Sequence, residues 1–192
     1  MDIYESCPKL ESRRFLLRLI DEEDLDDLIE IYSDKNALPF FNSDNCHGDN
    51  FYYPTKEKMQ KAIRFWITSY KERWFVRWTI VDKSIGKAIG TIEMFHRESD
   101  DAFNHCGVIR VDVGSRYENA ADIYDILSLF IPPSFDLFRC TEVITKAPIY
   151  AVERTEALKK IGFHESEHRM IGTYDRYVYK DYWTIGEKDV LK

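Results

Sequence analysis

The segment from Cys106 to Ile131 has the clearest potential for chemistry. Apolar residues at 109, 111 and 113 alternate with polar ones, which is typical of a strand with one buried face, and Gly114-Ser115 marks a turn. From Ala120 onward, apolar residues at 123, 126, 127 and 130 follow helical spacing. A strand that turns directly into a helix leaves the first backbone N–H groups of the helix unpaired, and such groups attract phosphates. The segment predicts an anion-binding turn, but most strand–helix connections bind nothing.

Metal and disulfide chemistry has little support. His47 and Asp49 form a pair of potential metal ligands, but two ligands do not make a site. We therefore expect no metal, and we expect reduced, mostly buried thiols rather than disulfides. The cysteines are widely spaced and contain no Cys-x-x-Cys pair, at Cys7, Cys46, Cys106 and Cys140.

Composition limits the class of protein. A chain of 192 residues with 44% hydrophobic residues fits a single domain, 1–192, with an ordinary core. The net charge of −7, without a basic stripe, argues against a nucleic-acid partner, because neutralising phosphates requires clustered Lys and Arg. No apolar run approaches the ~18 residues of a membrane span, and the start of the chain is acidic, unlike a signal peptide. We expect no membrane partner and a cytoplasmic location.

The patterns along the chain predict the order β-α-α-β-β-β-α-β-α-β-β. This order indicates an α+β domain of three layers, with a mixed, largely antiparallel central sheet flanked by helices. Residues 39–54 form a connection long enough to be a lid or binding loop. The expected elements are a strand at 12–20, helices capped by Asp21 and Thr55, strands at 74–81, 88–95 and 107–113, a helix from Ala120 that stops before Pro132-Pro133, a strand at 142–146, a helix at 152–161 and a hairpin at 168–171 and 174–182.

The element order, the Val111-x-Val113 strand before the turn, and the ending Leu158-Lys159-Lys160-Ile161-Gly162-Phe163 resemble the GNAT superfamily of N-acetyltransferases. The likeness covers about Ser12 to Tyr182 and is stronger for the branch that acetylates ribosomal-protein amino termini. It implies an acyl-CoA N-acyltransferase-like fold, acetyl-CoA as cosubstrate, and a small-molecule amine or a peptide amino group as acceptor. In the family, the strand backbone pairs with the pantetheine arm and the N–H groups of the turn hold the pyrophosphate.

Carried over by position, the resemblance places Val111 and Val113 along the pantetheine. The pyrophosphate loop then spans Arg116-Tyr117-Glu118-Asn119-Ala120-Ala121, against the family pattern Gln/Arg-x-x-Gly-x-Gly/Ala. Asn119 replaces the central Gly, and Asn is the least costly substitute if φ is positive there. A Glu118 carboxylate ~5 Å from a phosphate would oppose it by ~3 kcal/mol at an effective dielectric constant near 20. CoA binding therefore requires Glu118 to point away from the phosphates.

A second departure from the family lies in the helix at 152–161. The family's frequent Asn and Ser fall on Ala151 and Arg154, and the Tyr that many members use to protonate the leaving thiolate falls on Leu158. Two interpretations of Arg154 stay open. Its guanidinium binds a CoA phosphate, for which it is well suited, or its side chain covers the helix surface.

Acetyl transfer requires a neutral amine, and a lysine-like amine has a pKa of ~10.4, so a base or desolvation must remove a proton. Related enzymes use an acid on the third strand of the sheet or on the next strand, acting through water. Glu93 is the first candidate for this base, and an exposed strand glutamate without a role is the alternative. A backbone N–H near Val111 to Val113 would hold the oxyanion.

The leading hypothesis is an acetyl-CoA-dependent N-acetyltransferase. Because the pyrophosphate loop departs from the pattern, the alternative is a noncatalytic acyl-CoA-binding or partner-binding module on the same fold. Acceptor recognition is expected mainly in residues 42–50 and in the last hairpin. Asp44 and Asp49 favour a cationic acceptor.

Overall fold

The computed structural model describes residues 2–190, which fold around an eight-stranded sheet. The strand order is β1-β2-β3-β4-β5-β6-β10-β7, and within these residues only β5 and β6 run parallel. This arrangement confirms the predicted mixed, largely antiparallel sheet. The strands are β1 (Leu10–Glu11), β2 (Phe15–Leu19), β3 (Val76–Asp82), β4 (Lys87–Arg97), β5 (Cys106–Val113), β6 (Glu142–Lys146), β7 (His164–Glu165) and β10 (Tyr182–Gly186), with β8 (Met170–Ile171) and β9 (Val178–Tyr179) paired separately.

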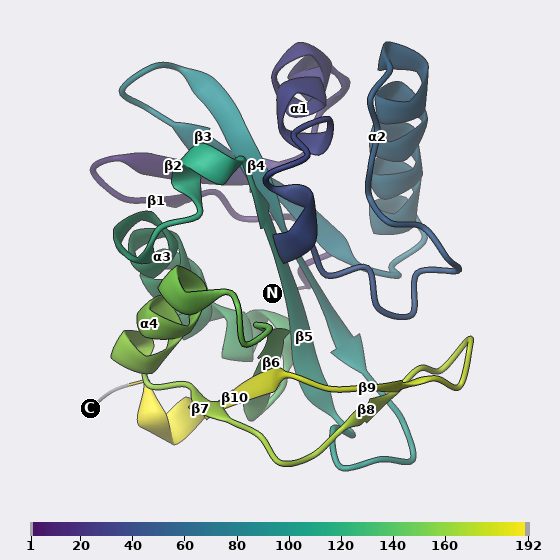
Figure 1. Cartoon of the computed structure of the whole chain (residues 1–192), viewed down its shortest axis with the longest axis vertical. Coiled ribbons are helices and arrows are strands. Elements are labelled where there is room, and N and C mark those ends of the chain that lie inside the picture. The colour runs from purple at the N-terminus through teal and green to yellow at the C-terminus, as the bar shows by residue number, and fades with distance from the viewer. Residues whose placement is uncertain (1, 191–192) are drawn as a thin grey trace.

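Helices cover both faces of the sheet. Figure 1 shows α1 (Leu25–Tyr32) and α2 (Lys56–Lys71) on one side, and α3 (Ala120–Phe138) and α4 (Val152–Ile161) on the other. As a result β5 is buried along its whole length, whereas its alternating pattern predicted one buried face. A central strand between two helical layers is buried on both sides, so its polar residues must find partners inside the protein.

Local capping follows the predictions at the first two helices. The Asp21 side chain accepts from the Glu23 N–H and forms a capping box with Asp24 at a 3-10 turn, Glu22–Asp24, that leads directly into α1. Thr55 accepts from the Lys58 N–H at the start of α2. These caps depend on residues three positions apart or fewer, so the sequence alone fixes them.

The predicted end of α3 is wrong, because the helix continues through Pro132-Pro133 to Phe138. Each proline removes a backbone donor, and an interior proline costs ~3 kcal/mol or more. The continuation buries Phe135 and Phe138 in the cluster between α3 and the sheet. Burial of a large apolar side chain contributes ~1.5–3 kcal/mol, so the packing of the last turns offsets a large part of the loss.

The four cysteines are free, as expected. Two of them, Cys106 and Cys140, are buried, and burial raises the pKa of the Cys106 thiol to about 12. Within residues 2–190, no helix combines the length and the apolar character that crossing a bilayer requires.

Candidate active site

Strands β5 and β6 separate partway along β5. Their parallel ladder joins Gly107–Ile109 to residues 143–145 and ends there, at the point where the Thr145 hydroxyl donates to the Ile109 carbonyl (3.2 Å). On its other edge, β5 stays paired with β4 as far as Val113. The last four residues of β5 therefore have a strand partner on one edge only.

The backbone groups of Val111 and Val113 point toward the open edge. The Gly114 N–H donates to the Ile89 carbonyl (3.0 Å), which places Gly114 among the residues bonded to β4. Along an antiparallel strand such residues alternate with residues whose N–H and C=O groups point away from that partner. Val111 and Val113 are in the second set, so their N–H and C=O groups are oriented to pair with an extended ligand lying between β5 and β6.

Three N–H groups of the turn after β5 already have partners, so the expectation that the turn leaves its N–H groups unpaired is wrong for Ser115, Tyr117 and Glu118. The Tyr117 and Glu118 amides donate within the turn, to the carbonyls of Gly114 (2.8 Å) and Ser115 (3.3 Å). The Ser115 N–H donates to the Asp34 carboxylate (3.0 Å). The N–H groups at the start of a helix attract negative charge from any source, so nearby carboxylates accept hydrogen bonds from them.

The first turn of α3 is capped in the same way. The Ala120 N–H donates to Glu153 of α4 (2.8 Å), and the Asp122 N–H donates to the Asn119 side chain (3.0 Å). Asn119 has φ −132° and ψ 156°, an extended conformation. The condition of positive φ, under which Asn would be the least costly substitute for Gly, is therefore not met. Asn119 is an ordinary N-cap residue, a role for which Asn is among the preferred types.

Glu118 and Arg154 form a buried pair. The guanidinium donates to both carboxylate oxygens (2.7 and 2.6 Å), and the two side chains are 4% and 3% exposed. Burial acts to lower the pKa of Arg154, but Glu118 outweighs it and raises that pKa above its ordinary value. Neither interpretation of Arg154 made from the sequence describes this contact. Because the pair is neutral overall, it cancels most of the repulsion that an isolated Glu118 carboxylate would exert on a phosphate.

The remaining residues of the expected loop differ in exposure. Arg116 and Ala121 are exposed, and the half-buried Tyr117 donates its hydroxyl to Asp82 (3.3 Å). A cavity of about 90 Å³ lies beside the Glu118–Arg154 pair and is lined by Phe40, Glu118, Tyr150, Ala151, Val152, Glu153 and Arg154.

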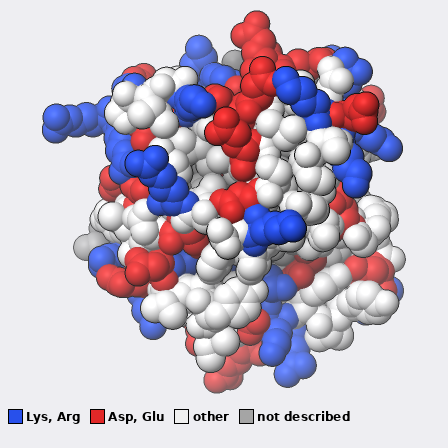
Figure 2. Space-filling view, turned by 45° about the horizontal axis from the view of Figure 1, so that its top comes forward, with Lys and Arg blue, Asp and Glu red and all other residues white. Residues whose placement is uncertain are grey.

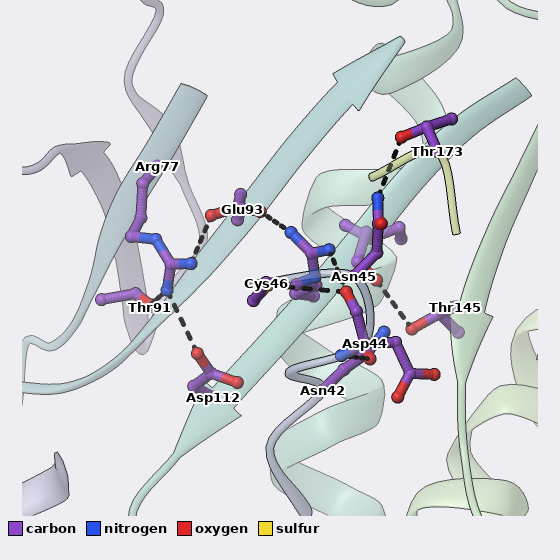
Figure 3. Close-up of polar contacts among 12 residues, drawn as sticks. Asn42, Asp44, Asn45, Cys46, Arg77, Thr91, Glu93, Asp112, Thr145 and Thr173 are labelled. Carbon is purple, nitrogen blue, oxygen red and sulfur yellow. Dashed lines mark hydrogen bonds and ion pairs between the residues drawn. The ribbon is translucent and has the colours of Figure 1, made fainter. Parts of the chain in front are cut away.

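Glu93 lies inside the protein, where it bridges two arginines. It is 2% exposed and accepts from Arg77 through one oxygen and from Arg110 through the other. Figure 3 shows Glu93 next to Arg77, with Asp112 on the far side of the same guanidinium. Burial acts to raise the pKa of Glu93, but the two arginines outweigh it and lower that pKa below its ordinary value. This position is not the exposed strand glutamate of the alternative interpretation, and a lowered pKa makes Glu93 a weak base.

Asp112 is the residue that sequence reasoning missed. One of its oxygens, Oδ2, accepts from the Tyr32 hydroxyl (2.8 Å) and from Arg77 (3.1 Å). The other oxygen, Oδ1, is buried and has no hydrogen-bond partner among the described residues. Burial raises the pKa of Asp112, more than Arg77 and Tyr32 lower it. A carboxylate between Val111 and Val113 in an otherwise apolar strand was the available signal.

The loop before α2 closes over the same region of the sheet. Its Asp44 carbonyl accepts from Arg110 (2.9 Å), and both Asp44 carboxylate oxygens accept from Lys146 of β6 (2.7 Å). The loop also meets the β8–β9 segment through a hydrogen bond from Asn45 to Thr173 (3.0 Å) that is visible in Figure 3.

The two loop aspartates already have partners. Lys146 compensates the charge of Asp44, and Asp49 accepts from the Tyr53 hydroxyl (2.8 Å). The His47 ring packs against the Tyr174 ring in a tilted arrangement, with ring centroids 4.4 Å apart, instead of forming a metal pair with Asp49. Figure 2 shows acidic and basic side chains interspersed over one face of the molecule. These contacts do not support the expected recognition of a cationic acceptor by Asp44 and Asp49.

A mixed sheet whose parallel pair diverges next to a strand–turn–helix junction defines the acyl-CoA N-acyltransferase fold. Residues 14–164 match the family model of the acetyltransferase (GNAT) domain, so the chain belongs to this family. It is an acetyltransferase enzyme of the N-acetyltransferase class, in a family that uses acetyl-CoA. A comparison with curated proteins found no match.

Solved structures share the fold at low sequence identity. A GNAT-family acetyltransferase from Bacillus anthracis superposes with a TM-score of 0.69 at 14% identity, over 94% of this chain and 99% of that one. A ribosomal-protein alanine acetyltransferase from Vibrio fischeri gives 0.69 at 17% identity, over 95% and 98%. A spermidine N-acetyltransferase from Vibrio cholerae, solved with CoA and spermine, gives 0.66 at 10% identity, over 94% and 100%.

Proposed function

We propose that this protein transfers the acetyl group of acetyl-CoA to a primary amine of a small molecule or a peptide. The observation that carries the proposal is the open edge of β5, where the backbone groups of Val111 and Val113 face away from β4 and β6 has already diverged. The pantetheine arm of acetyl-CoA carries amide groups, so it can extend the sheet along this edge. Relatives in fold act on a ribosomal protein and on spermidine, which both present amino groups.

The pyrophosphate of CoA would bind at the turn from Arg116 to Ala121. Two carboxylates now occupy amides of this region, Asp34 at Ser115 and Glu153 at Ala120. A phosphate is a stronger acceptor with more oxygens, so it would replace them at the same N–H groups. Arg154 lies next to this turn, paired with Glu118, and adds a guanidinium to the binding region.

In the reaction, the amine nitrogen attacks the thioester carbon, the C–S bond breaks, and CoA leaves as a thiol after taking up a proton. The attacking nitrogen loses a proton, which we assign through water to Asp112, because its Oδ1 is unpartnered and burial raises its pKa. Glu93, the candidate from the sequence, would instead hold Arg77 and Arg110 in place beside it. The Val111 or Val113 N–H on the open edge would stabilise the oxyanion.

Incubation of the purified protein with acetyl-CoA and a panel of amines tests the proposed function. The panel should include polyamines, amino acids and peptides with free amino termini, and free thiol and acetylated product are both measured. We expect thiol release that depends on one class of amine and an acetylated product of that amine. Tight CoA binding without release for any amine would contradict the proposal and support a noncatalytic acyl-CoA-binding module.

Replacing Glu153 by Gln is expected to tighten CoA binding about fivefold. The amide oxygen of Gln can still accept from the Ala120 N–H, but the negative charge at the phosphate-binding turn is gone. Glu153 is exposed, so solvent screening reduces its repulsion to about 1 kcal/mol, which corresponds to this factor. Isothermal titration calorimetry with CoA measures the change in affinity.

The matched control is Glu156→Gln. Glu156 lies on the same helix, is also exposed, and pairs with Lys160 (2.9 Å) instead of with an amide of the turn. CoA affinity of this variant should stay within twofold of the unmodified protein. If Glu153→Gln leaves CoA binding unchanged or weaker, the phosphates do not bind at the Ala120 amide.

A further inference from the structure

We propose that His96, Glu98 and His105 form a binding site for a divalent transition-metal ion of the zinc type. His96 lies near the end of β4, Glu98 just after it, and His105 directly before β5, so the hairpin between these strands brings the three together. One ligand atom from each lies within 4.8 Å of the others. Two imidazoles and one carboxylate are the set that holds zinc in open, three-ligand sites.

The hydrogen bond of His96 determines which of its nitrogens is available. His96 Nδ1 lies 3.0 Å from the Phe138 carbonyl oxygen, and a carbonyl can only accept, so Nδ1 carries the proton. In the neutral ring, Nε2 then presents its lone pair, and it faces His105 Nδ1. A backbone carbonyl that orients the second nitrogen of a histidine is the usual support of a metal ligand.

The spacing of the two ring nitrogens fits a shared ion. His96 Nε2 and His105 Nδ1 are 3.5 Å apart, which is long for a hydrogen bond between them. Two nitrogens at ~2.05 Å from a tetrahedral centre lie ~3.3 Å from each other. The rings therefore need to move by only a fraction of an ångström to bind one ion. The Glu98 carboxylate has no hydrogen-bond or ion-pair partner among the described residues, and a rotation of its exposed side chain brings it to the same centre.

The hairpin loop is held in shape independently of any ion. Arg97 donates to both carboxylate oxygens of Asp101 (2.6 Å), and the Ser99 N–H donates to Asn104 (2.9 Å). His105 has φ 56°, a left-handed conformation that is uncommon outside Gly and Asn. These contacts order the two histidines before binding, which lowers the entropic cost of binding the ion.

Solvent can reach the remaining coordination position. A cavity of about 440 Å³ borders Glu98 and His105 and is closed on its other side by residues near the β8–β9 hairpin, Thr173 and Arg176. The cluster lies at the Cys106 end of β5, whereas the open edge begins after Ile109 and ends at Val113. At ~3.3 Å per residue, the open edge begins ~13 Å and ends ~23 Å from Cys106, so the metal site is separate from the acetyl-transfer site.

Titration of chelator-treated protein with Zn²⁺, in competition with a chromophoric indicator, tests the proposal without an activity assay. We expect one high-affinity equivalent per chain and a rise in melting temperature, because an ion that binds only the folded chain stabilises it. His96→Asn and His105→Asn should each weaken this binding by more than about tenfold. Asn at 96 can keep the hydrogen bond to the Phe138 carbonyl, and Asn at 105 tolerates the positive φ, so both variants should fold.

His47→Asn is the matched control, since His47 is exposed and also has positive φ (54°) but lies outside the cluster. Its Zn²⁺ affinity should equal that of the unmodified protein. An equal loss in all three variants, no loss in the two cluster variants, or no Zn²⁺ binding would each overturn the proposal. Zn²⁺ held by a half-buried thiol such as Cys7 or Cys46 would appear as binding that survives both cluster substitutions.

Discussion

Replacing Glu93 by Ala is expected to lower the free energy of unfolding by about 3–5 kcal/mol, because it leaves two buried guanidiniums without their carboxylate. Arg77 is 0% and Arg110 7% exposed, and both donate to Glu93. Arg77 would retain Asp112, whereas Arg110 would be left with the Asp44 carbonyl and the face of Phe95, neither of which carries a full negative charge. Chemical denaturation with urea measures the loss.

Two further substitutions separate charge from packing at this position. Glu93→Gln keeps the shape and one acceptor oxygen, so it should be less destabilising than Ala but still clearly measurable. Glu165→Ala, at an exposed strand glutamate of β7, should change stability by less than about 0.5 kcal/mol. If Glu93→Ala cost under 1 kcal/mol, the arginines would have other partners and the buried bridge would not stabilise the sheet.

Replacing Asp112 by Asn is expected to reduce kcat/KM by about 100-fold or more for the amine that the panel identifies. Asn has nearly the same shape as Asp, and its amide oxygen can still accept the hydrogen bond from the Tyr32 hydroxyl. An amide cannot take up the proton of the amine, so the general base is lost. Burial raises the pKa of Asp112, so the rate of the unmodified enzyme should climb as the pH rises through that raised value and Asp112 loses its proton. In Asp112→Asn this limb of the pH profile should be absent.

The pH dependence of the free energy of unfolding tests the same carboxyl group independently. Because the pKa of Asp112 is higher in the folded chain than in the unfolded chain, protonated Asp112 adds stability at low pH, and this contribution is lost as the pH rises through the folded value. Asp112→Asn should remove this part of the pH dependence.

Asp24→Asn is the control for general disruption, since Asp24 is also buried and paired with an arginine, Arg18. It should lower stability without flattening the pH profile of kcat/KM. If Asp112→Asn retained the full activity and the same pH profile, Asp112 would be a structural partner of Arg77 only, and the proton would leave by another route.

The sequence by itself determined the features that depend on near neighbours. The Asp21 and Thr55 caps, the periodicities of strands and helices, and the strand–turn–helix at Gly114 all arise within a few residues. The element order was sufficient to indicate the fold and the resemblance to the acetyltransferase family. Even so, the end of α3 was mispredicted, because the gain from burying Phe135 and Phe138 lies in the packing and not in the local preference of proline.

The tertiary structure decided the partners of the charged residues. Glu93 and Asp112 look like polar positions of half-exposed strands until helices cover both faces of the sheet and Arg77 is placed between them. Arg154 and Glu118 are 36 residues apart, and the turn amides are capped by carboxylates from α4 and from Asp34. Electrostatic pairing acts through space, and a linear pattern carries no information about which distant charge will arrive at a given position. Local preferences therefore determined the helices and strands, and tertiary packing determined which charged side chains meet in the site.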